Sequence, residues 1–194
     1  MLPPFYQACF QAQLSGTQWV MLQMLVLLLQ KERRVTIEKL ATLFAQPIQF
    51  ESRRRSIQRF LVLPQLSVRA LWFPILKHWL KLHLKGSNQV RLVIDRTQWQ
   101  QRNVFVVSVV WDKRAIPVYW QLLSSQGSSN LAEHKAMLRP VLRLFKSYQI
   151  LLMADREFHS IKLASWLDSK RIKFALPQKH NTYIQQSKQK FLTG

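Results

Sequence analysis

Apolar residues in the first half of the chain recur with the spacing of helices. The clearest case is the segment Thr36–Ala45, whose apolar residues fall at i, i+3, i+4 and i+7, on one face of a helix. These residues are Ile37, Leu40, Ala41 and Phe44. The Thr36 side chain is of a type that caps a first helical turn. Further helices are predicted at Leu14–Gln30, at Glu51–Leu63 with Ile57, Phe60 and Leu61 facing inward, and at Leu66–Leu84 with a bend at Pro74.

The pattern changes after residue 86 to short apolar runs separated by turns. Strands are predicted at Val90–Ile94, Val104–Trp111, Ala115–Leu123, Ile150–Ala154 and Ile172–Leu176. The second and third strands should pair as a hairpin across Asp112–Arg114. Helices are predicted between the later strands, at Leu131–Tyr148 and Phe158–Ser169. The predicted order of elements is three strands followed by helix, strand, helix and strand. This is the order of the ribonuclease-H-like fold.

These elements predict an α/β protein in two domains. Residues 1–86 would form a helical region, and residues 87–194 a ribonuclease-H-like core with a mixed sheet. The apolar stretch Trp19–Leu29 is about half the length that a membrane-spanning helix needs, which favours a buried core helix and no membrane partner.

Charge points to a polyanionic partner. The chain has 29 Lys and Arg against 9 Asp and Glu, a net charge of +20. Such a chain attracts nucleic acid in a salt-dependent way, although charge alone does not distinguish DNA from RNA. Cys9 is the only cysteine, which excludes an internal disulfide and a zinc site built from cysteines. A single thiol suits the reducing cytoplasm of a bacterium.

Two aspartates carry the candidate chemistry. Asp95 and Asp155 each follow a strongly apolar strand, and in the predicted topology the first and fourth strands lie side by side. Two facing carboxylates repel unless a cation lies between them, and hard oxygen ligands suit Mg²⁺ or Mn²⁺. Such ions serve phosphodiester chemistry. From spacing alone, the alternative that each aspartate only caps a loop or the next helix stays open.

The residues around both aspartates resemble a known family. Two motifs, Val93-Ile94-Asp95-Arg96-Thr97-Gln98-Trp99 and Ala154-Asp155-Arg156-Glu157-Phe158, are similar to the first two acidic motifs of DDE-class insertion-sequence transposases, closest to the bacterial IS-four family. Two further segments resemble its third strand and the loop before its helix. They are Arg114-Ala115-Ile116-Pro117-Val118 and Gly127-Ser128-Ser129-Asn130. The similarity runs from about Val90 to Pro177.

The resemblance implies metal-dependent cleavage and transfer of DNA strands. In this family three acids hold two divalent ions, and Asp95 and Asp155 match the first two acids. Arg96 and Arg156 are expected to contact DNA, and Phe158 is expected to pack. Glu157 should point away from Asp155. His134, with the other isolated histidines, is expected at the surface.

The third acid of the family has no counterpart in this sequence. It is a Glu on a later helix, in a motif with Tyr, Arg and Lys, whereas the only acids after Asp155 are Glu157 and Asp168. The resemblance therefore implies a truncated transposase, with a core incomplete at its C-terminus and inactive alone. The alternative is a non-catalytic DNA-binding protein derived from a transposase fragment. A basic RNA-binding protein is a further reading, and the sequence defines no oligomeric state, so a homo-oligomer stays open.

The helical region offers a candidate DNA-binding surface. Thr36–Ala45 and Glu51–Leu63 would form a unit like a helix-turn-helix, although their link is longer than a compact turn. The second helix would present arginines able to reach phosphates and guanine edges. They are Arg53, Arg54, Arg55 and Arg59. An ordinary helical hairpin with a solvated basic face remains the alternative.

Overall fold

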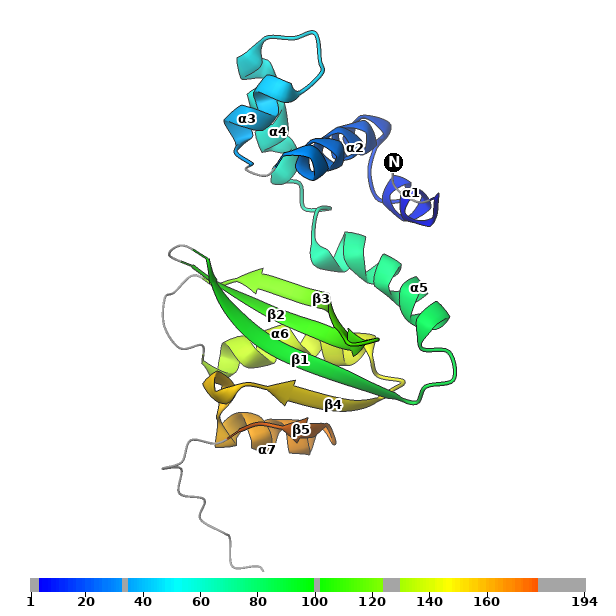
Figure 1. Cartoon of the computed structure of the whole chain (residues 1–194), viewed down its shortest axis with the longest axis vertical. Coiled ribbons are helices and arrows are strands. Elements are labelled where there is room, and N and C mark those ends of the chain that lie inside the picture. The colour runs from blue at the N-terminus through cyan, green and yellow to red at the C-terminus, as the bar shows by residue number, and fades with distance from the viewer. Residues whose placement is uncertain (1–3, 33–34, 100–101, 124–129, 178–194) are drawn as a thin grey trace, which may run out of the picture. The chain divides into compact units, whose positions relative to one another are not determined.

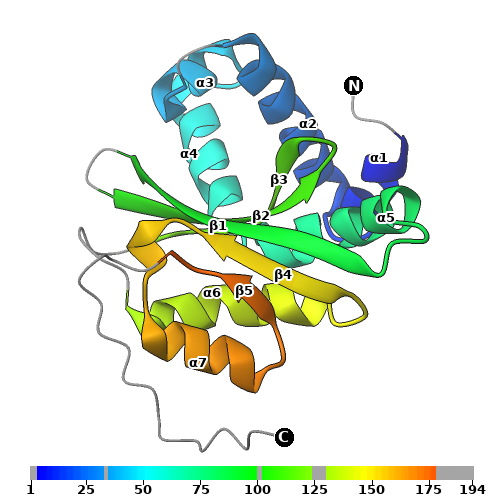
Figure 2. The same cartoon turned by 60° about the horizontal axis from the view of Figure 1, so that its bottom comes forward.

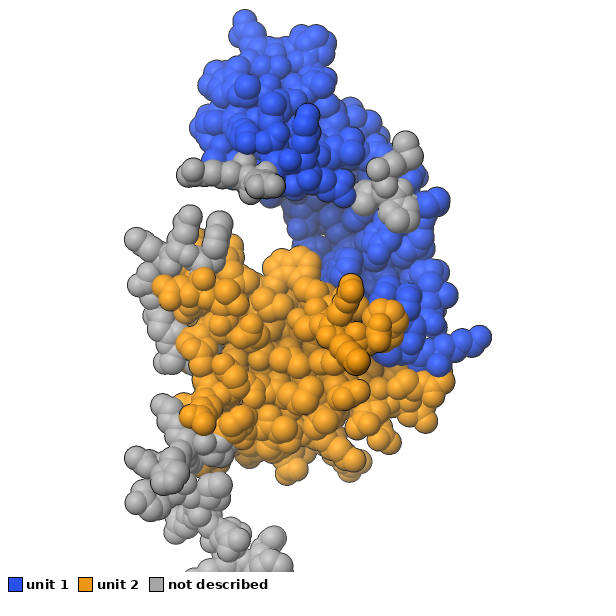
Figure 3. Space-filling view, in the orientation of Figure 1, with its two compact units in different colours: residues 1–85 blue, residues 86–194 orange. Residues whose placement is uncertain are grey.

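The computed structural model describes residues 4–32, 35–99, 102–123 and 130–177. The chain divides into two compact units, Met1–Lys85 and Gly86–Gly194, which Figure 3 distinguishes by colour. The motif residues 127–129 and the segment 178–194 lie outside the described residues. Within the described ranges, no helix has the length and apolar character needed to cross a membrane.

Unit 1 consists of helices (Figure 1). In chain order they are α1 (Pro4–Gln11), α2 (Gly16–Lys31), α3 (Ile37–Leu43), α4 (Phe50–Leu61), the π-helical turn η1 (Val68–Trp72) and α5 (Phe73–His83). Helix α1 was not anticipated from the sequence pattern. Helix α2 begins at a capping box between Ser15 and Gln18, and the Thr36 hydroxyl caps α3 by accepting from the Lys39 amide at 3.2 Å, as predicted.

One apolar cluster holds α2, α3 and α4 together. It contains Leu25, Leu40, Ala41, Phe44, Ile57 and Phe60, so the predicted inner face of α3 is confirmed. The prediction that Leu61 faces inward is wrong, because Leu61 is the last residue of α4 and remains 49% exposed. Just before Pro74, where a bend was predicted, the chain forms the π-helical turn η1, which runs directly into α5. Pro74 lies in the first turn of α5, a position at which proline is common.

Unit 2 is a five-stranded mixed sheet with two helices (Figures 1 and 2). The strands are β1 (Gln89–Trp99), β2 (Arg102–Trp111), β3 (Arg114–Leu122), β4 (Gln149–Ala154) and β5 (Lys173–Ala175), in the spatial order β3-β2-β1-β4-β5. The first three run antiparallel to one another, and β4 and β5 continue the sheet in parallel with β1. Helices α6 (Leu131–Leu144) and α7 (Ile161–Ser169) lie on one face of the sheet.

The sequence pattern explains most of these elements. Asp112 and Lys113 turn between β2 and β3 with φ values of 43° and 62°, the left-handed backbone that a two-residue hairpin turn requires. Asn130 and Glu133 form a capping box that starts α6. The helix predicted at Phe158–Ser169 is instead split, because Asp155 starts the short 3₁₀ turn η2 (Arg156–Phe158) and Ser160 caps α7 separately.

Candidate metal site at the ends of β1 and β4

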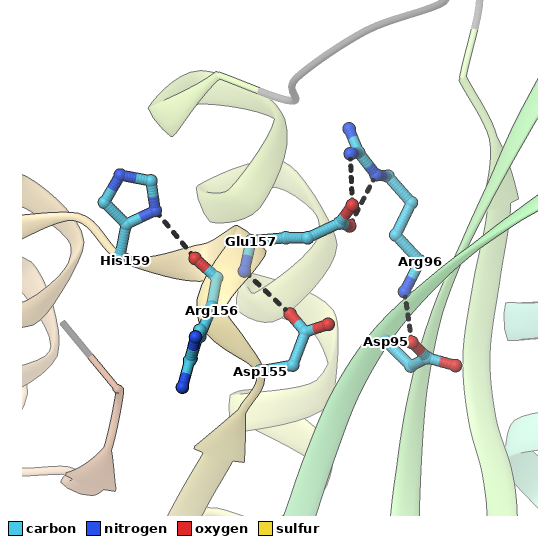
Figure 4. Close-up of polar contacts among 6 residues, drawn as sticks. All are labelled: Asp95, Arg96, Asp155, Arg156, Glu157 and His159. Atoms are coloured by element: carbon cyan, nitrogen blue, oxygen red, sulfur yellow. Dashed lines mark hydrogen bonds and ion pairs between the residues drawn. The ribbon is translucent and has the colours of Figure 1, made fainter. Parts of the chain in front are cut away.

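The parallel register of β1 and β4 brings the two aspartates together. The pairing runs from Gln89 opposite Gln149 to Ile94 opposite Ala154. Asp95 and Asp155 are the next residues after this last pair in the two segments. Neighbouring strands are about 4.8 Å apart. Figure 4 shows both side chains at this point, and both residues are exposed.

Asp95 is not at the end of its strand, which corrects the expectation from sequence. Strand β1 continues to Trp99, and Asp95 lies opposite Val106 of β2. Strand β4, in contrast, does end at Ala154. The difference arises because β1 is central in the sheet, so its antiparallel pairing with β2 continues after β4 has left its other edge.

Both aspartates order their own segments through carboxylate oxygens, and Oδ2 of Asp95 also accepts from the Thr97 hydroxyl at 3.5 Å. Oδ1 of Asp95 accepts from the Arg96 amide at 2.8 Å, and Oδ1 of Asp155 accepts from the Glu157 amide at 3.0 Å. Asp155 therefore does cap the following turn, the alternative considered from the sequence. Among the described residues, no hydrogen bond to Oδ2 of Asp155 is found, so capping leaves that oxygen for a ligand.

An ion pair links the two segments that carry the aspartates. The guanidinium of Arg96 donates two hydrogen bonds to the Glu157 carboxylate, from Nε to Oε2 at 2.9 Å and from Nη2 to Oε1 at 2.8 Å (Figure 4). The side chains of Arg96 and Glu157 are 15% and 45% exposed. The hydrogen bonds that Arg96 donates to Glu157 raise the pKa of Arg96, burial opposes the rise, and the negative charges of Glu157 and then Asp155 add to it.

Aromatic residues pack beside this ion pair. Phe158 is 1% exposed, as its expected packing role requires, and its ring meets Phe105 edge-on with centroids 5.2 Å apart. The ring of His134 lies 5.3 Å from that of Phe158. The expectation that His134 is at the surface is wrong, because only 3% of it is exposed. Burial lowers the pKa of His134, Glu133 opposes this effect and the positive charge of Arg96 adds to it.

The arginines predicted to bind DNA lie in three settings. Arg96 is held by Glu157, whereas Arg156 on η2 is exposed and its side chain extends away from Asp95 in Figure 4. In unit 1, Arg53 donates to the carbonyls of Phe44 and Gln46 at 3.3 and 3.4 Å, and so fastens the link between α3 and α4.

The other arginines of α4 differ in their acidic neighbours. Arg54 lies 3.4 Å from Glu38 and 3.8 Å from Glu51. Arg55 and Arg59 are exposed, and within the described ranges neither forms an ion pair with an acid. Since Arg53 and Arg54 are engaged inside unit 1, Arg55 and Arg59 are the residues of this set that face solvent with their charge uncompensated.

All nine acidic residues of the chain lie within the described ranges. Across those ranges, no group of three or more His, Cys, Asp or Glu side chains is placed to hold a metal ion. Asp95 and Asp155 thus stand as a pair, with Glu157 directed to Arg96. Sequence reasoning missed the ion pair, because nothing in the local pattern indicates which partner a Glu two residues after an Asp will meet.

The sheet order, the parallel pairing of β1 with β4 and the two helices define unit 2 as a ribonuclease-H-like α/β domain. The family model of the transposase DDE domain matches residues 86–193. This match covers more than half of the chain, and the chain belongs to the transposase DDE domain family. Its general function is that of a transposase, which acts on DNA, and domains of this family generally use divalent metal ions. No curated protein matches the chain significantly.

Proposed function

We propose that this chain uses Asp95 and Asp155 as two ligands for Mg²⁺ or Mn²⁺ in an insertion-sequence transposase of the IS-four family. The observation that carries the proposal is the register of β1 and β4, which makes neighbours of two aspartates that are 60 positions apart in the sequence. Exposed carboxylates are the hard oxygen donors that these ions prefer, and Oδ2 of Asp155 accepts no hydrogen bond from the described residues. When bound, such ions activate the attacking oxygen and stabilise the leaving one in phosphodiester cleavage.

Residues around the pair have separate roles in this proposal. Arg96 and Glu157 hold the two segments in register, and the exposed Arg156 approaches a DNA phosphate. Aromatic packing of Phe158 under the turn fixes the direction in which Asp155 leaves β4. Arg96 is then a positioning residue rather than a direct DNA contact, because its guanidinium is already occupied by Glu157.

Residues 1–86 are proposed to bind DNA through the exposed arginines of α4. Arg55 and Arg59 supply charge that no acid of the described chain neutralises, which suits contacts to phosphates. The double variant Arg55→Gln/Arg59→Gln should weaken duplex binding at least fivefold. The matched variant Lys77→Gln/Lys81→Gln on α5 should change it less than twofold. Equal effects of the two, or an affinity that does not change with added salt, would contradict this role.

We further propose that this chain does not cleave DNA alone. The structure describes all nine acidic residues, and none of the other seven lies with Asp95 and Asp155 in a group that could hold a metal ion. A third carboxylate would therefore have to come from outside this sequence. Pure protein incubated with Mn²⁺ and a duplex carrying the terminal repeats that flank its gene should leave both strands intact. Metal-dependent cutting that disappears in Asp95→Ala would overturn this part and leave an active enzyme.

Metal binding is tested directly by titrating Mn²⁺ and following its electron paramagnetic resonance signal. Asp95→Asn and Asp155→Asn should each weaken binding at least tenfold. Asp112→Asn is the matched control, because Asp112 is exposed, lies in the β2–β3 turn and has a φ of 43° that Asn tolerates. If Asp95→Asn and Asp112→Asn bind Mn²⁺ equally well, the pair is not a metal site and the non-catalytic DNA-binding alternative is favoured.

A further inference from the structure

Unit 2 contains a second feature, a cleft at the opposite end of β4 from the aspartates. It has a volume of about 810 Å³ and is formed by the last turns of α6 and α7 and the first residues of β4 and β5. Six of its lining side chains are basic and none is acidic. The basic residues are Arg139, Arg143, Lys146, Lys170, Arg171 and Lys173. Tyr148 and Trp166 add aromatic surface to the same walls.

The positive charge of this cleft is not neutralised by the protein. Within the described ranges none of the six basic side chains forms an ion pair, and the sequence has no Asp or Glu after Asp168. Cations are ordinarily favoured near helix C-termini, which accounts for one or two of them. Six in one concavity without a counter-charge produce a focused positive potential, which is the property of a site for a polyanion.

The backbone at Arg171 is strained. Helix α7 ends with the Ile172 amide donating to the Leu167 carbonyl at 3.1 Å and the Arg171 amide to the Asp168 carbonyl at 2.8 Å. This pattern places the residue after the cap in the left-handed region, where glycine is usual. Arg171 occupies it with a φ of 56°, although a side chain there costs about 1 kcal/mol. An arginine in place of glycine thus adds a cation to the cleft at the expense of stability.

We propose that this cleft binds the phosphate backbone of duplex DNA. The inference rests on the proposed function for the choice of duplex DNA as the polyanion. The cleft is lined by Gln149 and Ile150 at the start of β4, whereas Asp155 follows its last residue. At about 3.3 Å per residue the two sites are roughly 15 to 20 Å apart, so they cannot contact the same phosphate. The cleft therefore adds a separate contact to DNA and needs no metal ion.

The test measures binding of a fluorescein-labelled duplex of random sequence to the full chain at a series of salt concentrations. The cleft variant is Arg143→Gln/Arg171→Gln/Lys173→Gln. The matched control is Arg102→Gln/Arg114→Gln/Lys162→Gln, which removes the same charge from exposed residues of unit 2 that do not line the cleft. At about 0.15 M salt the cleft variant should lose at least tenfold in affinity and the control less than threefold. The slope of log affinity against log salt should fall by about 2 to 3 in the cleft variant.

Equal losses in the two triple variants would overturn the proposal, since only total charge would then matter. Tighter binding of single-stranded DNA or RNA than of duplex DNA would overturn the choice of ligand. If the cleft variant is unfolded by circular dichroism, Lys146→Gln/Lys170→Gln replaces it, because both residues are exposed and lie outside the regular elements. Its slope should fall by about 2, and an unchanged slope would refute the cleft.

Mn²⁺ binding separates this inference from the proposed function. The cleft variant should bind Mn²⁺ like the unmodified chain, and Asp95→Asn should bind the duplex like the unmodified chain in the absence of metal. Loss of Mn²⁺ binding in Asp95→Asn together with normal duplex binding by the cleft variant would refute the cleft and leave the metal site standing. The reverse pair of results would refute the metal site and support the cleft.

Discussion

The ion pair between Arg96 and Glu157 allows a quantitative test of how the aspartate segments are held. Replacing either side chain by Ala removes two charge-assisted hydrogen bonds of 2.8 and 2.9 Å. Such bonds contribute about 1.5 to 3 kcal/mol when buried, and exposed pairs contribute about 0.2 to 1 kcal/mol. Since Arg96 is 15% and Glu157 is 45% exposed, we expect a coupling free energy of about 1 to 1.5 kcal/mol between these limits.

The assay is a double-mutant cycle of Arg96→Ala and Glu157→Ala. Urea unfolding gives the free energy of unfolding of the four proteins, and hydrogen exchange of peptides from β1 and β4 assigns the effect to unit 2. Arg96→Lys keeps the charge but lacks the planar fork, so it should lose most of the coupling. Both Ala variants should also weaken Mn²⁺ binding by the aspartates. A coupling below about 0.5 kcal/mol, within the error of such cycles, would refute the idea that this pair fastens the two segments.

Three further predictions concern residues around the two sites. Phe158→Ala should lower the free energy of unfolding by about 3 to 4 kcal/mol, because the ring is 1% exposed, whereas Ile161→Ala, at a residue that is 52% exposed, should lower it much less. Similar losses for the two variants in urea unfolding would contradict the packing role of Phe158. Since the pKa of His134 is lowered in the folded protein, the unfolded chain binds the proton more readily, and stability should fall as the pH drops below 6.5. His134→Phe should flatten this pH dependence, and an unchanged profile would exclude His134 as its source. Arg171→Gly should raise the free energy of unfolding by about 1 kcal/mol, because glycine adopts the left-handed backbone without strain, and it should also weaken duplex binding. A less stable variant would show that the φ of 56° at Arg171 costs no stability.

Local sequence patterns account for much of the fold. The inner face of α3 followed from the spacing of its apolar residues, and the cap at Thr36 from its side chain. Short apolar runs with β-branched residues located the five strands, and the compact turn at Asp112 identified the hairpin. These features were predictable because they depend on interactions between residues a few positions apart, which the sequence lists side by side.

Other features could not be predicted because they depend on packing. The burial of His134 results from its position on α6 above Phe105 and Phe158, residues distant from it in sequence. Similarly, the exposure of Leu61 reflects where the cluster of unit 1 ends rather than the periodicity of α4. In both cases the apolar spacing predicted the helix correctly, but the predicted exposure of one side chain on it was wrong.

The sequence by itself showed that Asp95 and Asp155 each follow an apolar run, and its nine acids left few candidates for a third carboxylate. Only the tertiary structure decided that the two aspartates are neighbours, through the pairing of Ile94 with Ala154. It also decided that Glu157 meets Arg96 and that the basic residues of α6, α7 and β5 line one cleft. The physical reason is that strand register depends on contacts between residues far apart in the sequence. A slip of one residue in that register turns every side chain of the strand to the other face of the sheet.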